Sequence, residues 1–171
     1  MRKISTASVR KRLRRLEDQL AIYQIISSYG PAADSCNMQD IQKHWAADCS
    51  YVMTDIGSAE GYAGLKALFD APFHQGLIKD GCAHIASLPH VVILGDKATA
   101  THYAQVFTQR ENAFVCVRVS IHRWEFSRHA NGWLMQRRTT SLLDGNPASR
   151  ELLKQAMQGP DSDPAPALLA N

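Results

Sequence analysis

The chain has 171 residues, 45% of them hydrophobic and 20% charged, and a formal net charge of +3. This length and composition are typical of a soluble globular protein with one domain and tails. No apolar run approaches the roughly 20 residues that span a bilayer, which excludes an integral membrane protein, and we expect no membrane partner.

The cysteines and the N-terminal segment favour a cytoplasmic protein. The four cysteines show no CxxC or zinc-knuckle spacing, which is typical of free thiols in a reducing compartment. The basic segment at residues 1–20 lacks the apolar core of about 7 to 15 residues found in secretory signals. Its cluster RKRLRR predicts a solvated helix face; contact with nucleic acid or acidic lipid is the alternative. No recognised nucleic-acid motif accompanies the cluster, so we expect no nucleic-acid partner.

Helices are predicted in the first half of the chain. Apolar residues at helical spacing predict a long helix over residues 8–29. Gly30-Pro31 should kink or interrupt this helix, which would place Asp34 just beyond a bend. Shorter helices are predicted over residues 38–47 and 62–70, with a short hairpin between them.

From residue 84 the hydrophobic period changes to two, which predicts four long strands. They read HIASLPHVVIL, KATATHYAQVFT, FVCVRVSIHRWEF and GWLMQRRTTSLL. The turn signals Gly95-Asp96 and Asn131-Gly132 predict antiparallel neighbours. Helices followed by a sheet indicate the α+β class.

The last part of the chain is predicted to add a helix and a tail. Asn146-Pro147 resembles an N-cap followed by proline at the first helical position, which predicts a helix over about residues 147–157. We therefore divide the chain into a basic arm at residues 1–11, a domain at 12–145, and a C-terminal helix with a flexible tail at 146–171. The helix is expected to cover a pocket mouth or a neighbouring subunit.

Alternation along the strands separates an apolar face from a more polar one. The apolar row of the strand FVCVRVSIHRWEF contains Val115, Val117, Val119 and Ile121, and the opposite row contains Cys116, Arg118, Ser120, His122 and Trp124. We interpret the second row as pocket lining, with a solvent-facing surface as the alternative. His102 lies among small residues that would leave room for a ligand or for a packed helix. Arg138 and Thr140 share a face of the last strand, and a buried arginine requires an anionic partner or substrate.

The order of these elements resembles the SnoaL-like branch of the nuclear-transport-factor-2-like superfamily. The likeness covers about residues 12–145 and rests on four patterns: LEDQLAIYQIISSYGPAADSCNMQDIQKHWAADCSY, GYAGLKAL, NGWLMQRR, and a histidine eleven residues before Gly95-Asp96. Within this branch the chain is most similar to the group of scytalone dehydratase, hexachlorocyclohexane dehydrochlorinase and bile acid dehydratase. The resemblance implies a cone-shaped α+β fold, in which N-terminal helices close a curved antiparallel sheet around a pocket.

The resemblance also implies a histidine–aspartate pair for β-elimination, which falls on His84 and Asp34. Cys82 and Arg138 match positions of the dehydrochlorinase, and Tyr29 matches a tyrosine of the bile acid dehydratase. The resemblance also places Arg118, Ser120 and His122 on the ligand-facing side of their strand.

These observations predict a dehydratase-type lyase that acts on a small oxygenated cyclic substrate. Neutral His84 would remove a proton next to a carbonyl, while Asp34 would fix the tautomer of the ring and stabilise the imidazolium. Stabilisation of the developing enolate would come from Arg138, with Tyr29, Tyr51 and His122 as further candidates. The predicted substrate-binding residues are Tyr29, Tyr51, Cys82, His102, Arg118, Ser120, His122 and Thr140. We expect no cofactor and no metal. A protonated His102 or a tyrosine would deliver or accept the water.

Three alternatives stay open. A ketosteroid-isomerase-like enzyme would use the same proton abstraction without a leaving group. A metal site would require His84, His102, His122 and Asp34 to converge. A non-catalytic small-molecule-binding or partner subunit would use the fold alone. The apolar row at residues 115–121 also predicts a homo-oligomer, with a trimer favoured over a dimer.

Overall fold

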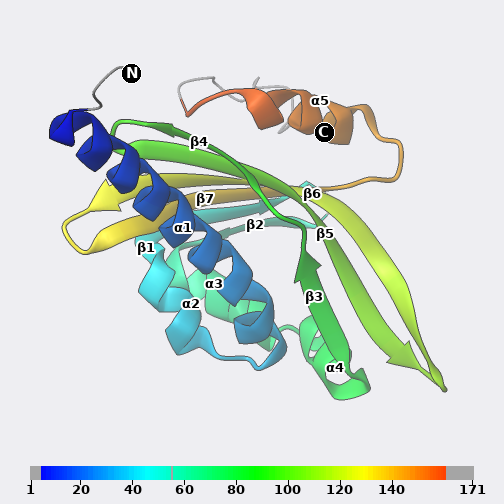
Figure 1. The fold of residues 1–171 in the computed structure, drawn as a ribbon. Coiled ribbons are helices and arrows are strands. Elements are labelled where there is room, and N and C mark those ends of the chain that lie inside the picture. Colours follow the sequence, from blue (N-terminus) through cyan, green and yellow to red (C-terminus); the bar gives the residue numbers. More distant parts are fainter. Residues whose placement is uncertain (1–4, 55, 161–171) are drawn as a thin grey trace.

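The computed structural model describes residues 5–54 and 56–160, whose helices and strands are drawn in Figure 1. The helices are α1 (Thr6–Asp34), α2 (Met38–His44), α3 (Gly61–Asp70), α4 (Pro72–Asp80) and α5 (Pro147–Lys154), which a short 3-10 helix (Gln155–Met157) follows. The strands are β1 (Trp45–Met53), β2 (Gly57–Glu60), β3 (Cys82–Ala86), β4 (His90–Leu94), β5 (Lys97–Arg110), β6 (Ala113–His129) and β7 (Gly132–Leu142). Helices α1 to α4 lie on one side of the sheet and α5 lies on the other (Figure 1). The predicted α+β class is confirmed.

The strands form one open, mixed sheet. Their order is β2-β1-β7-β6-β5-β3, and β4 also pairs with β5. Neighbours are antiparallel, as predicted, except that β1 pairs with β7 in parallel. This parallel pair joins strands from opposite ends of the domain. Turn signals predict only the pairing of strands that follow each other in the chain, so they do not predict this pair. The sheet is therefore not a closed barrel.

Helix α1 continues to Asp34, so Gly30-Pro31 does not interrupt it. The last turns of α1 are packed into the core, with Gly30, Ala32 and Ala33 buried. This burial outweighs the backbone hydrogen bond that proline removes. Asp34 consequently lies in the final turn of α1 rather than beyond a bend.

Two other boundaries differ from the prediction. Helix α2 ends at His44, and Trp45 begins β1 instead of lying inside the helix. The stretch HIASLPHVVIL forms two strands, β3 and β4, which both pair with β5. Pro89 lies between them, and its missing N–H explains why the strand is interrupted there. Helix α4 was not predicted, although Pro72 at its first turn is a helix-start signal.

A β-bulge divides the apolar row predicted for β6. Arg118 pairs with Val106 and Cys116 pairs with Phe107, so Val117 is an extra residue in β6. Paired residues on neighbouring strands point to the same face, so the two faces exchange residues at the bulge. Cys116 therefore lies opposite Phe107, on the face away from Arg118, and is exposed. The predicted placement of Cys116 beside Ser120 is wrong for this reason.

Helix α5 packs on the outer face of the sheet, opposite the pocket described below. The predicted cap is confirmed, because the Asn146 side chain accepts a 2.9 Å hydrogen bond from the Ala148 N–H. Leu152 is buried, and buried Arg123 on β6 donates a 2.9 Å bond to the Gln155 carbonyl. Residues 147–157 therefore do not cover the pocket mouth of their own chain, so this half of the prediction is wrong, and contact with a neighbouring subunit stays a prediction. The flexible tail is predicted from residue 159, and all of it beyond residue 160 lies outside the described residues.

None of the helices in the described ranges is long and apolar enough to cross a membrane. Helix α1 runs without a break from Thr6 through residue 12, and the division of the chain at residues 11 and 145 stays a prediction.

Candidate functional site

Asp34 and His84 form a hydrogen-bonded pair where α1 meets β3. Asp34 Oδ1 lies 2.5 Å from His84 Nδ1, and Asp34 Oδ2 accepts a 2.9 Å bond from the His84 backbone N–H. Both carboxylate oxygens therefore hold the same residue. The two side chains are only 23% and 20% exposed. This arrangement fixes the orientation of the imidazole relative to α1.

Gly30 allows the helix to come this close to the strand. A Cβ atom at Gly30 would lie 2.3 Å from the His84 carbonyl oxygen, well inside any allowed contact. The glycine is therefore needed for the approach of α1 to β3, one turn before Asp34. The dyad depends on this backbone contact as well as on its two side chains.

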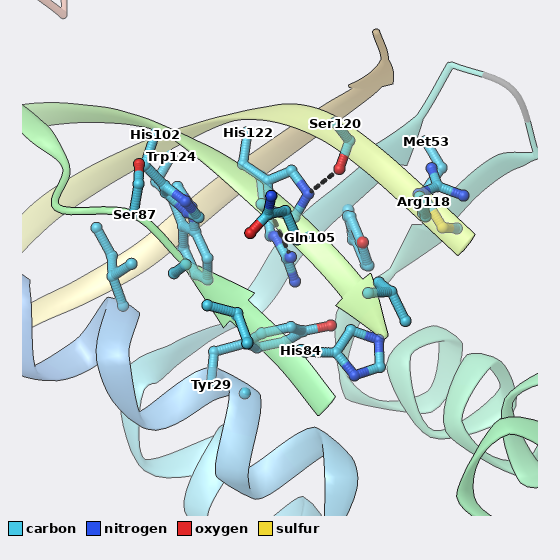
Figure 2. Close-up of a pocket in the computed structure, with 18 of the residues that line it drawn as sticks. Tyr29, Met53, His84, Ser87, His102, Gln105, Arg118, Ser120, His122 and Trp124 are labelled. Atoms are coloured by element: carbon cyan, nitrogen blue, oxygen red, sulfur yellow. Dashed lines mark hydrogen bonds between the residues drawn. The ribbon is translucent and has the colours of Figure 1, made fainter. Parts of the chain in front are cut away.

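The hydrogen bonds to Asp34 determine the tautomer of His84. Burial would raise the pKa of the Asp34 carboxyl, but the bonds from the His84 ring and backbone outweigh it and hold that pKa below the usual 3.8. An ionised carboxylate only accepts hydrogen bonds, so His84 Nδ1 carries a proton. In the neutral ring Nε2 then has a free lone pair, and the ring lies at the cavity in Figure 2. A basic nitrogen is thus available to a ligand.

Cys82 lies behind the dyad rather than in the cavity. Its Sγ donates to Asp34 Oδ1 over 3.4 Å, and burial, together with the Asp34 charge, raises the pKa of the thiol to about 12. Asp34, Cys82 and His84 are the only group in the described ranges with atoms close enough to share a metal ion. In the absence of a metal ion, burial and the Asp34 charge therefore keep this thiol protonated. The four-residue metal site of the third alternative does not form, because His102 and His122 are not part of this group.

The dyad borders a cavity of about 720 Å³ between the helices and the sheet. This size suits a small cyclic ligand. The predicted residues that line it are Tyr29, Tyr51, His84, His102, Arg118, Ser120, His122 and Arg138. Apolar side chains line much of the rest, among them Leu68 and Phe69 from α3 and Phe73 from α4. The cavity is therefore mostly apolar, with its polar groups on a few positions.

Three rows of paired residues cross the sheet and build the polar wall of the cavity. They are Ala100, Trp124, Arg138 and Tyr51; His102, His122, Thr140 and Met53; and Ala104, Ser120 and Leu142. Members of a row point to the same face because they are cross-strand partners. The sheet register thus gathers residues from β1, β5, β6 and β7 that are distant in the chain.

Arg138 is a buried cation without a carboxylate partner in the described ranges. It is 2% exposed, and its guanidinium carbon lies 3.8 Å from the centre of the Tyr29 ring. The rings of Tyr51 and Trp124 are each 4.6 Å away. Cation–π contacts therefore replace an ion pair. Nη2 is hydrogen-bonded to a histidine over 2.8 Å, whereas Nε and Nη1 have no hydrogen-bond partner among the described residues.

His102 and His122 are buried neutral rings on adjacent strands, with centres 5.1 Å apart. His102 Nδ1 lies 2.9 Å from the Tyr103 carbonyl oxygen, and its Nε2 accepts a 2.9 Å bond from Trp124 Nε1. Burial, with the Arg138 charge adding to it, lowers the pKa of His102 to about 4. The same two causes hold the pKa of His122 well below 6.5. Both rings are therefore uncharged at neutral pH.

Tyr29 completes the cavity from the helix side. Its ring stacks on Trp45 at 6.1 Å and meets Trp124 edge-on at 5.7 Å. Burial raises the pKa of the Tyr29 hydroxyl, although the Arg138 charge opposes this effect. The hydroxyl is therefore a protonated hydrogen-bond donor near the cation.

Three predicted site residues do not line the cavity: Asp34 and Cys82 lie behind His84, and Thr140 is buried beneath its neighbours. His74 also lines the cavity, although it is not among the site residues predicted from the sequence. Its Nδ1 lies 3.1 Å from the Phe69 carbonyl, and its ring centre is 6.1 Å from that of His84. The start signal of α4 at Pro72 could have drawn attention to this histidine.

Comparisons with known proteins agree with this architecture. The model of the SnoaL-like domain matches residues 14–139. An NTF2-like protein with a cystatin-like fold from Novosphingobium aromaticivorans is 39% identical, with 87% of this chain and 97% of that chain covered and a TM-score of 0.84. A comparison with curated proteins gives no match.

Two more distant structures share the fold. Hexachlorocyclohexane dehydrochlorinase LinA-type3 from Novosphingobium barchaimii is 16% identical, with 77% of this chain and 90% of that chain covered and a TM-score of 0.67. A putative dehydratase of the NTF2-like family from Streptomyces avermitilis is 14% identical, with 75% and 97% covered and a TM-score of 0.62. The match over residues 14–139 spans well over half of the chain, so the protein belongs to the SnoaL-like domain family.

Proposed function

We propose that the protein is a carbon–oxygen lyase of the dehydratase type, which eliminates water from a small oxygenated cyclic substrate. The observation that carries this proposal is the Asp34–His84 dyad at the edge of a cavity of about 720 Å³. The same pair was inferred from the resemblance, and distant fold relatives include a dehydrochlorinase and a putative dehydratase.

The first step is removal of a proton from the carbon next to a carbonyl. Neutral His84 accepts the proton at Nε2, and ionised Asp34 stabilises the imidazolium that results. A positioned base of this kind supplies a factor of about 10² to 10⁴ in rate. The remaining barrier must be lowered by stabilisation of the enolate.

The Arg138 charge supports that stabilisation. It lies among aromatic rings, and no carboxylate of residues 5–54 and 56–160 neutralises it, so its field reaches the cavity with little screening. Preorganised charges in dry sites contribute most when negative charge develops on the substrate. The enolate is the state with that charge.

Loss of a β-hydroxyl completes the elimination and needs a proton donor. His102 does not fit this role, because both of its nitrogens are engaged and its pKa is about 4. The Tyr29 hydroxyl fits better, since burial keeps it protonated. We therefore assign to Tyr29 the hydrogen bond to the departing oxygen; the proton held by His84 completes the water molecule, so that Tyr29 stays protonated and His84 becomes neutral again.

An isomerase would use the same dyad and return the proton to another carbon. A non-catalytic binding subunit would use the cavity alone. The two enzyme reactions differ in their products, because only the lyase releases water. Hydrogen-bond geometry between Asp34 and His84 favours an enzyme over a binding subunit.

The test is a screen of cyclic β-hydroxy ketones in D₂O, with mass spectrometry of the products. The wild-type chain should incorporate deuterium at the α-carbon and release a dehydrated enone. Asp34→Asn and His84→Gln should each reduce both signals by a factor of about 10² or more. The double variant should lose little more than either single one, because the pair acts as a unit.

The melting temperature of Asp34→Asn shows whether Asp34 has a structural role, because a structural partner would lower the stability of the protein when it is replaced. Asp34→Asn should keep the fold and ligand binding while presenting the wrong group to the ring. Near wild-type turnover per folded molecule in Asp34→Asn would refute the dyad as the catalytic group. Incorporation of deuterium from the solvent without loss of water would identify an isomerase.

A further inference from the structure

The hydrogen bond between Arg138 and His122 determines the direction of the chain of bonds that follows it. A guanidinium only donates, so His122 Nδ1, 2.8 Å from Arg138 Nη2, must accept. An imidazolium has protons on both nitrogens and would oppose this bond. Burial and the Arg138 charge also hold the pKa of His122 well below 6.5, so the ring is neutral. Its single proton is therefore on Nε2.

The same reasoning extends one bond further, to Ser120. His122 Nε2 lies 2.8 Å from Ser120 Oγ, the dashed line between these residues in Figure 2. Because Nε2 carries the proton, the serine oxygen accepts. The hydroxyl proton of Ser120 must then point to another acceptor. No other hydrogen bond of this hydroxyl is present in the described ranges, although Ser120 is only 1% exposed.

The surroundings of Ser120 leave the cavity as the place for that acceptor. Ser120 lines the cavity, and its cross-strand partner Ala104 is small enough to leave space beside it. His102, in the adjacent row, has both nitrogens engaged within the protein. A buried hydroxyl proton without an acceptor is unfavourable, so a ligand that supplies one gains affinity.

We propose that Ser120 is the hydrogen-bond donor that binds a carbonyl oxygen of the ligand, and that Arg138 and His122 act as positioning residues that direct its proton into the cavity. The ligand class is therefore a neutral cyclic ketone rather than an amine, which would offer a donor at this position. This inference rests on the proposed function, since it locates the carbonyl whose neighbouring proton His84 removes. It separates recognition at Ser120 from proton abstraction at His84.

The tautomer of His122 is measured by nitrogen NMR of histidine-labelled protein at pH 7. We expect His122 to be neutral with its proton on Nε2. A proton on Nδ1, or a charged ring, would overturn the proposal because the bond to Ser120 would then run the other way. This readout requires neither a substrate nor turnover.

Binding of two probes tests the donor itself. The probes are 2-tetralone, a bicyclic ketone, and tetralin, the hydrocarbon without the oxygen; titration calorimetry gives their dissociation constants. Wild-type protein should prefer the ketone, and Ser120→Ala should weaken ketone binding about fivefold, the value of one neutral hydrogen bond, without affecting tetralin. Ser120→Thr, which keeps the hydroxyl, should restore the preference.

Ser141→Ala is the matched control, since Ser141 is also buried but pairs with Ile121 on the outer face. It should leave both probes unchanged. Absence of a ketone preference in wild-type protein, or an equal loss for both probes in Ser120→Ala, would overturn the proposal. Failure of the dyad as a catalyst would leave these affinities unchanged, so the two proposals fail separately.

Discussion

Acid should destabilise the folded chain through its buried histidines, and His102 allows the size of the effect to be worked out. The ring is 4% exposed, and its Nε2 accepts the Trp124 N–H. A second proton at Nε2 would leave two donors facing each other in a buried place. Burial, with the nearby Arg138 charge adding to it, lowers the pKa of His102 to about 4.

The sign follows from the unfolded state, where a histidine takes up its proton near pH 6.5. Between pH 6.5 and about 4 the unfolded chain binds a proton that the folded chain refuses, so stability falls as pH falls through this window. A depression from 6.5 to about 4 corresponds to about 3 kcal/mol in total, at 1.36 kcal/mol per pH unit. At pH 5 the loss is about 2 kcal/mol. His122 acts in the same direction.

The measurement is urea unfolding at pH 7.5 and pH 5, for wild-type protein and for His102→Gln, which keeps an acceptor for Trp124. The free energy of unfolding should fall by about 2 kcal/mol more in wild type than in the variant. Exposed His90 supplies the control, because His90→Gln should retain the wild-type pH dependence. An identical pH dependence in wild type and His102→Gln would refute the reasoning.

Three further predictions follow from the packing. Gly30→Ala would place a methyl group 2.3 Å from the His84 carbonyl oxygen, so α1 should move away from β3. Turnover should fall because Asp34 then no longer holds His84, whereas Ala→Gly substitutions elsewhere on α1, the control, should not reduce it. Deletion of residues 146–171 should lower the melting temperature, because Arg123 loses its hydrogen-bond partner at Gln155. The affinity of the folded protein for a ketone should be unchanged, and deletion of residues 161–171 alone is the control. A homo-oligomer, with a trimer favoured, is expected from the exposed apolar side chains of β5 and β6, and a monomeric mass in solution at micromolar concentration would contradict it.

The polar wall of the pocket could be predicted from the sequence because its pattern is local. Alternation in β6 places Ser120, His122 and Trp124 on one face, and the structure has them there. The alternation fails where Val117 forms the bulge, since one extra residue reverses the side chains on one side of it relative to the other, here Cys116 relative to Arg118. Nothing in the run FVCVRV marks the bulge position, so Cys116 was assigned to the wrong face.

Contacts between distant segments were less accessible to sequence reasoning. The Asp34–His84 pair joins residues fifty positions apart, and it was inferred only through the resemblance to a family. Pro31 predicted a break that tertiary packing of Ala32 and Ala33 overrides. The partners of Arg138 were also not foreseen, because a buried guanidinium over aromatic rings requires three separate strands and a helix to meet.

The two halves of the proposed chemistry therefore depend on different kinds of structure. The base is held by a helix–strand contact, since Asp34 belongs to α1 and His84 to β3. The cation and its hydrogen-bond chain are held by the register of the sheet, because Arg138, His122 and Ser120 lie on two paired strands. A displacement of α1 separates Asp34 from His84 and also moves the Tyr29 ring that packs on Arg138, whereas the bonds that join Arg138, His122 and Ser120 lie within the sheet. Substitutions at Gly30 and Ser120 consequently address separate parts of the site, the first through proton abstraction and the second through recognition of the carbonyl.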